Sequence, residues 1–82
     1  MQKNEKLKRK IAKKIGETIR FYRNKNNISQ ENLAFNIGVD RTYISAIEQG
    51  NKCASVYCLY LTAQALNTSL KELVDINIKT TM

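Results

Sequence analysis

Four polar side chains in one short segment are of types that contact nucleic-acid bases: Arg41, Thr42, Ser45 and Gln49. Their spacing places all four on one stripe of a helix with 3.6 residues per turn, opposite Ile44 and Ile47. The major groove of B-DNA is about 12 Å wide and admits such a helix, and Arg is the side chain that most often reads guanine there. This polar stripe therefore predicts a helix that reads double-stranded DNA. A solvated surface helix is the alternative interpretation.

The residues around the polar stripe predict two short helices joined by a tight turn. Ser29 is a good N-cap for the first helix, because its hydroxyl can accept a backbone N–H of the first turn. Gly38 can end that helix in the left-handed conformation. Asp40 is expected to cap the second helix, which ends at Gly50. Two capped helices across a glycine turn are typical of a helix-turn-helix.

A longer helix is predicted before this motif. Its apolar residues recur at helical spacing: Leu7, Ile11, Ile15, Ile19 and Tyr22. We expect it to run from an Asn4 cap to about Lys25 and to pack on the helix-turn-helix. Gly16 within it lowers helix stability by about 1 kcal/mol relative to Ala. Close approach of a neighbouring helix is the expected reason for this glycine.

Glu48 is expected in the last turn of the second motif helix, where a carboxylate opposes the helix dipole. It should therefore have a basic partner, and Arg23 near the end of the long helix is the candidate. We predict a structural ion pair between these two side chains.

Two further helices are predicted after Gly50. The first runs from its Ser55 cap to about Asn67, and the second follows a Ser69 cap. The core stripe expected for the first consists of Val56, Leu59, Ala63 and Leu66. Because exposed apolar surface usually marks a contact, the residues left over predict a dimer interface. Together with residues of the last helix and tail, that interface is predicted to contain Tyr57, Tyr60, Leu61, Gln64, Leu73 and Ile76.

The net charge of +7 is concentrated at the start of the chain. Residues 1–14 hold seven basic side chains against Glu5, whereas residues 15–76 hold six basic and six acidic ones. Attraction to a polyanion should therefore come mainly from the N-terminal segment. The alternatives are a solvated helix face and an amphipathic helix on an acidic membrane surface.

The composition argues against catalysis, cofactors and metals. Histidine is absent, and the only cysteines are Cys53 and Cys58. Two thiols alone do not complete a tetrahedral zinc site, and no nucleophile lies beside a base. No apolar run approaches the roughly 18 residues of a membrane span, and the start lacks the apolar region of a signal peptide. We expect a cytoplasmic protein without catalytic residues, cofactor or metal.

The length of 82 residues and the absence of proline and alternating strand patterns predict one all-α unit. Within it we distinguish a basic N-terminal extension, 1–14, that continues into the first helix. The helix-turn-helix DNA-binding domain is expected over 15–76 and a C-terminal tail over 77–82.

The stretch from Ile15 to Val74 resembles the xenobiotic-response-element family of helix-turn-helix proteins, which includes the phage repressors and Cro. The resemblance rests on the Ser-Gln-Glu start at Ser29, on Leu33-Ala34, on Ile37-Gly38, and on Ile47-Glu48 followed by Gly50. Within this family, the string from Asp40 to Ser45 is most similar to the controller proteins of restriction–modification systems.

This resemblance implies a compact, five-helix, lambda-repressor-like fold and a homodimer that forms through its C-terminal helices. The positions that match base-reading or groove-facing residues are Arg41, Thr42, Ser45 and Ala46. The residues assigned to DNA phosphates are Ser29, Gln30, Tyr43, Asn51 and Lys52. Arg23 and Glu48 match a structural pair of the family, in agreement with the dipole argument.

The function expected from the residues and the resemblance together is a transcriptional regulator on a near-palindromic operator. Its partners would be double-stranded DNA, a second copy of itself and RNA polymerase, with no membrane. One alternative is an antitoxin-type repressor whose exposed tyrosines bind a protein toxin. The other is an RNA or membrane-surface adaptor that acts through the lysine-rich start.

Overall fold

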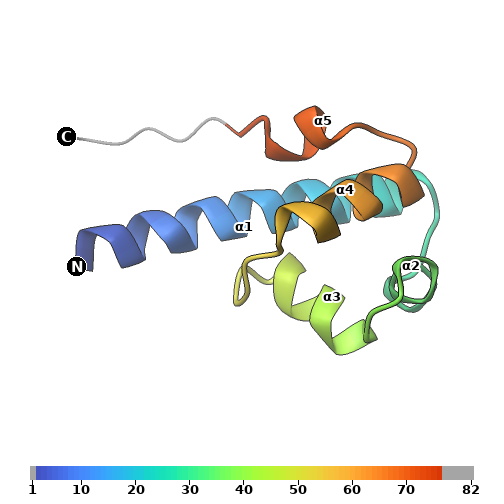
Figure 1. The fold of residues 1–82 in the computed structure, drawn as a ribbon, viewed down its shortest axis with the longest axis horizontal. Coiled ribbons are helices and arrows are strands. Elements are labelled where there is room, and N and C mark those ends of the chain that lie inside the picture. Colours follow the sequence, from blue (N-terminus) through green and yellow to red (C-terminus); the bar gives the residue numbers. More distant parts are fainter. Residues whose placement is uncertain (1, 77–82) are drawn as a thin grey trace.

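Five α-helices and no strands make up residues 2–76, the part of the chain that the computed structural model describes. They are α1 (Gln2–Lys25), α2 (Gln30–Ile37), α3 (Arg41–Glu48), α4 (Val56–Ala65) and α5 (Leu70–Val74). α1 is the longest, and the other four gather around its C-terminal half (Figure 1). The expected all-α, five-helix fold is confirmed. The tail predicted at 77–82 lies outside the described residues.

Three of the predicted N-caps form. The hydroxyls of Ser29, Ser55 and Ser69 each accept a backbone N–H three residues later, over 3.0 to 3.2 Å. Gly38 ends α2 in the left-handed conformation, with φ of 78°. Asp40 stands at the N-cap position of α3, but the expectation that its side chain caps the helix is wrong. The N–H of Tyr43 bonds instead to the backbone carbonyl of Asp40, at 3.0 Å.

The start of α1 also differs from the expectation. The helix begins at Gln2, so Asn4 lies in its first turn and does not cap it. No helix-breaking residue precedes Asn4, and nothing in the sequence forces a later start. α1 then continues without a break through the expected boundary between residues 14 and 15.

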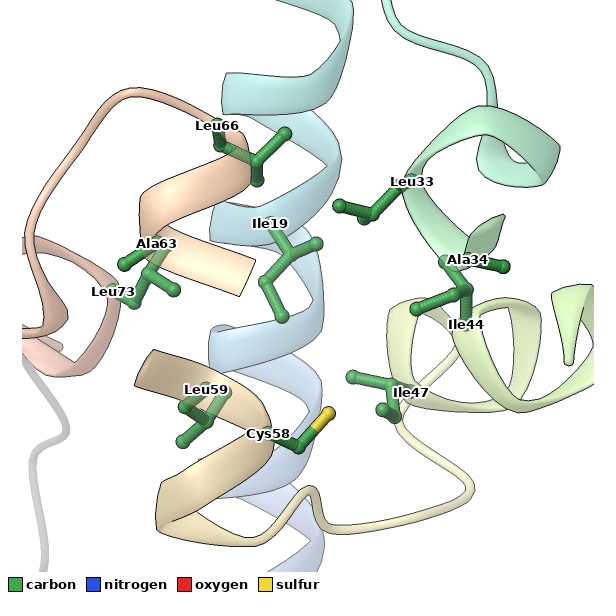
Figure 2. Close-up of a cluster of buried hydrophobic side chains, with 10 residues drawn as sticks. All are labelled: Ile19, Leu33, Ala34, Ile44, Ile47, Cys58, Leu59, Ala63, Leu66 and Leu73. Atoms are coloured by element: carbon green, nitrogen blue, oxygen red, sulfur yellow. The ribbon is translucent and has the colours of Figure 1, made fainter. Parts of the chain in front are cut away.

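Ile19 of α1 is the centre of the hydrophobic core (Figure 2). Side chains of α2 and α3 approach Ile19 from one side, and side chains of α4, its C-cap and α5 approach it from the other. The first group is Leu33, Ala34, Ile44 and Ile47, and the second is Cys58, Leu59, Ala63, Leu66 and Leu73. The core therefore holds the helix-turn-helix against α1, and α4 and α5 close its other side.

Two residues expected in the core are exposed. Val56 is 70% exposed, because it lies at the very start of α4, and Cys58 fills the space toward Ile47 instead (Figure 2). Leu7 is 36% exposed because the first turns of α1 extend past the helices that cover the rest of it. Thr62 is buried unexpectedly, and its hydroxyl is satisfied within α4 by the carbonyl of Cys58 at 2.8 Å.

Gly16 marks the close approach of α1 to the end of α3. A Cβ at this position would clash with the carbonyl oxygen of Ile47 and would lie 2.8 Å from the carbonyl oxygen of Glu48. Only a residue without a side chain allows this contact, as the sequence predicts. None of the helices within residues 2–76 is both long enough and apolar enough to cross a membrane.

We expect Gly16→Ala to destabilise the protein by about 2 kcal/mol, because overpacking against backbone atoms outweighs the gain in helix propensity. Urea denaturation followed by circular dichroism measures the loss. Gly38→Ala is the control: it has open space around the added Cβ but a positive φ, and should lower stability by only about 1 kcal/mol. A Gly16→Ala protein as stable as the wild type would contradict the close approach.

Candidate nucleic-acid interface

The carboxylate of Glu48 joins three helices at the C-terminal end of α3. Its side chain is fully buried, and its nearest partner is Arg23 of α1. The Arg23 Nε donates to Oε2 over 2.7 Å, and Nη2 donates to Oε1 over 3.1 Å. The remaining Arg23 nitrogen, Nη1, donates to the backbone carbonyl of Ile28 at 2.9 Å. Arg23 thus connects α1, the turn before α2, and α3.

Two partners of Glu48 were not predicted from the sequence. Gln30 of α2 donates its Nε2 to Oε1 of Glu48 over 3.0 Å, and Arg20 donates Nε to the same oxygen over 3.3 Å. Arg20 was detectable in principle, since it lies three positions before Arg23 and therefore on the same face of α1. Gln30 gave no comparable signal, because its contact depends on how α2 packs against α3.

These donors explain the ionisation of Glu48. Burial raises the pKa of its carboxyl, but hydrogen bonds from Arg23 and Gln30, the charge of Arg23 and a hydrogen bond from Arg20 together lower that pKa below its usual value. Among the side chains that the structure describes, those of residues 4–76, no buried nitrogen or oxygen lacks a hydrogen-bond partner. The buried charge is therefore fully compensated.

The polar stripe of α3 faces away from the core. Arg41, Thr42 and Gln49 are exposed, and Ser45 is half-buried. Gln49 donates its Nε2 to the hydroxyl of Ser45 over 3.1 Å. Ala46 is also half-buried. The structure thus places the residues predicted to read bases on one accessible side of a short helix, whose other side is buried through Ile44 and Ile47.

The residues predicted to contact phosphates lie at both ends of the helix-turn-helix. Ser29 is at the start of α2, whereas the exposed Asn51 and Lys52 follow α3. Gln30 is half-buried and already bonded to Glu48. Its Oε1 accepts a hydrogen bond from Nη1 of Arg41 at 3.5 Å. Gln30 therefore connects the buried carboxylate to the polar stripe.

Tyr43 is half-buried at the edge of the core. Burial raises the pKa of its hydroxyl, and the neighbouring Cys58 thiol raises it further. The Nζ of Lys52 lies 5.6 Å from the centre of the Tyr43 ring. The aromatic ring therefore supports the loop that carries Lys52.

Tyr57, Tyr60 and Gln64 of α4 are exposed and Leu61 is half-buried. We call these four residues the α4 face. Tyr57 is 72% exposed and Tyr60, which lies one turn later on the same side of α4, is 50% exposed. The assignment of Leu73 to the dimer interface is wrong, because Leu73 is fully buried in the core of its own chain (Figure 2). Ile76 is half-buried.

Neither cysteine has the surroundings of a metal site. Cys58 is buried in the core and Cys53 is exposed, and both are free thiols. In the part of the chain that the structure describes, no three side chains of metal-ligating type come together.

The same architecture occurs in known proteins. A helix-turn-helix family, HTH_3, matches residues 19–73. The chain is 42% identical over 64 residues to the control protein C.SmaI of Serratia marcescens. This match covers 78% of this chain and 76% of that protein. It is 41% identical over 62 residues to the control protein C.BamHI of Bacillus amyloliquefaciens, with coverage of 74% and 76%. It is also similar to the crystal structure of the restriction–modification controller protein C.AhdI from Aeromonas hydrophila. That match has a TM-score of 0.73 and 35% identity, and covers 76% of this chain and 94% of that chain.

We expect Glu48→Gln to lower the free energy of unfolding at pH 7 by about 3 kcal/mol, because it leaves Arg23 buried without a counter-charge. The carboxylate has a lowered pKa in the folded state, so its stabilisation is present above its usual value of 4.5 and is lost as the pH falls below it. The difference between the wild type and Glu48→Gln should therefore shrink on acidification below about pH 4.5. Urea denaturation at pH 7 and at acidic pH measures both effects. Glu17→Gln, a change at an exposed carboxylate of α1, should have little effect, and equal losses in the two variants would refute the role of Glu48.

Proposed function

Because the chain belongs to the HTH_3 helix-turn-helix family and is a transcriptional regulator of the restriction–modification controller type, we propose that it binds a near-palindromic DNA operator as a homodimer. The family assignment confirms the resemblance drawn from the sequence. It also makes the protein a DNA-binding regulator and not an enzyme. The homodimer, the operator and the contact residues extend this assignment.

The observation that carries the proposal is the exposed polar stripe on a helix whose opposite side is fixed. Ile44 and Ile47 are buried, and Glu48 is bonded to α1 and α2. A helix held in this way can enter the major groove with its N-terminal residues leading. Arg41 and Thr42 are then the residues that specify bases, and Ser45 and Ala46 face the groove. Ala46 is too small to bond a base and at most contacts a thymine methyl group.

Contacts to phosphates would fix the position of α3 on the duplex. We assign them to Ser29 and Gln30 at the start of α2 and to Tyr43, Asn51 and Lys52. Such contacts orient a protein without reading sequence, and they make binding sensitive to salt. Gln30 would contribute through the second hydrogen of its Nε2, because the first is donated to Glu48 and its Oε1 only accepts hydrogen bonds.

The α4 face is the surface that we assign to the homodimer. Its two exposed tyrosines would lose contact with water in a symmetric interface. A dimer would present two copies of α3 about 34 Å apart, which is one turn of B-DNA, so that the operator should be an inverted repeat. A regulator on such an operator acts in the cytoplasm, and RNA polymerase is the partner through which it would alter transcription.

We expect Arg41→Ala to remove one symmetric base preference from the operator and to cost about 1–3 kcal/mol at that position, because Arg41 is assigned to a base edge. Selection of bound sequences from random duplex DNA at moderate salt compares the variant with the wild type. Lys71→Ala, which removes an exposed cation of α5, is the control and should leave the motif unchanged. Uniform weakening on all sequences would make Arg41 a phosphate contact. If the wild type selects no motif, the proposed function is wrong.

We expect Tyr60→Glu to convert the protein from dimer to monomer, because two carboxylates would be brought together in the interface without partners. Analytical ultracentrifugation measures the mass of each species. Phe35→Glu makes the same kind of change at an exposed aromatic residue of α2 and should leave the dimer intact. A Tyr60→Glu protein that sediments as the wild-type dimer would place the interface elsewhere.

A further inference from the structure

A groove of about 500 Å³ lies between the N-terminal half of α1 and the loop that follows α3. Its charged lining consists of Lys8 and Arg9 from α1, Lys52 from the loop, and Glu5. We call it the basic groove. A role of this groove in DNA binding rests on the function proposed above and deepens it. It adds α1, which contributes none of the residues assigned to DNA there.

The basic groove has an excess of positive charge that none of the described residues neutralises. Three cations line it against one carboxylate. Among the described residues, the ion pairs are those of Arg20 and Arg23 with Glu48, so Lys8, Arg9 and Lys52 have no acidic partner within 4.0 Å. All three are exposed. Such cations attract a polyanion that can bring negative charge into the groove.

The two walls of the groove are held in a fixed relation to each other and to α3. Gly50 has φ of 78°, and a Cβ on it would lie 2.9 Å from the Cα of Lys13. The N–H of Asn51 bonds to the carbonyl of Ala46 in α3 at 2.9 Å. Figure 1 shows this loop on the same side of α1 as α3. Asn51, which lines the groove, also donates its Nδ2 to Oε1 of Gln49 in the polar stripe over 3.2 Å, so the groove adjoins the stripe at the C-terminal end of α3.

Its chemistry and place point to one partner. We propose that the basic groove binds the sugar–phosphate backbone of the DNA that flanks the bases read by α3. Residues 5–12 of α1 extend over about 12 Å at 1.5 Å per residue. That length corresponds to about three base steps of 3.4 Å along one strand.

A membrane surface fits the same segment less well. An interfacial helix needs a broad apolar side that is free to enter the lipid. Between residues 4 and 14, Leu7 is the only large apolar side chain that is exposed, and it is 36% exposed. The segment contains no aromatic residue. The family match begins at residue 19, so this half of α1 lies outside it.

The test compares the wild type with two double variants of α1. Lys8→Gln/Arg9→Gln removes two charges from the groove. Lys10→Gln/Lys14→Gln removes two charges outside it, since Lys10 lies about 200° around the helix from Lys8. Gln has nearly the helix propensity of Lys and Arg, so both proteins should keep α1, which circular dichroism checks.

Each protein is titrated with two duplexes that carry the operator selected above. One duplex is trimmed at its outermost preferred bases, and the other extends about ten base pairs further at each end. Fluorescence anisotropy gives the affinity between about 50 and 300 mM salt. On the extended duplex, the slope of log K, where K is the association constant, against log salt should be less steep for the groove variant than for the wild type. The expected difference is about two per protomer, because each lost phosphate contact contributes about 0.9. The control variant should change the steepness of this salt dependence by much less. On the trimmed duplex, the three proteins should bind with the same affinity.

Equal losses of affinity in the two variants would overturn the proposal, since they would indicate only a diffuse charge effect. A loss of affinity by the groove variant that is equally large on the trimmed duplex would overturn it as well. Vesicles of phosphatidylglycerol and a single-stranded RNA are titrated in parallel. If the groove variant bound the vesicles or the RNA more weakly than the wild type, with no loss of affinity for the extended duplex, the proposal would be overturned in favour of that partner. If the wild type selects an operator and the groove variant matches the control, only the groove proposal fails. If no operator is selected, the proposed function fails together with it.

Discussion

The buried carboxylate of Glu48 is the constraint on which the placement of the helix-turn-helix depends. A charge without access to water must be matched by donors of good geometry, and here they come from α1 and α2. Because Glu48 itself belongs to α3, satisfying it fixes three helices relative to one another. The absence of a side chain at Gly16 lets α1 approach closely enough for these bonds to form. Hydrophobic burial around Ile19 stabilises the same arrangement but is less directional.

α1 is the common support of the polar stripe, the α4 face and the basic groove. Its C-terminal half holds α3 through Arg23 and Gly16, so it orients the polar stripe. It also contributes Ile19, on which α4 packs to present the α4 face (Figure 2). Its N-terminal half forms one wall of the basic groove. A single long helix therefore relates the proposed base-reading residues, the proposed dimer interface and the proposed contact with flanking DNA.

Local signals in the sequence were sufficient for the five helices and for most of their ends, since Ser29 and Gly38 act on the backbone within one turn. The predicted caps at Asn4 and Asp40 are the exceptions. The partner of Glu48 could also be predicted, because a carboxylate against a helix dipole requires a cation. The other failures concern contacts that depend on packing. Leu73 has the same hydrophobicity in a core as in an interface, and only the position of α5 makes it buried. Gln30 joins the Glu48 site through the angle between α2 and α3, which no residue pattern encodes.

The attachment of α3 by its C-terminal end has a mechanical consequence. Asp40 makes no side-chain capping bond at the other end, where Arg41 and Thr42 lie. Eight residues at 1.5 Å each make a lever of about 12 Å, so that a rotation of about 5° at Glu48 moves Arg41 by about 1 Å. A displacement of that size is enough to break a hydrogen bond to a base. On the proposed function, substitution of Arg23, which bonds Glu48 and is assigned no contact with DNA, would therefore retune which operator is preferred, so that operator preference can evolve at a residue that does not touch the bases.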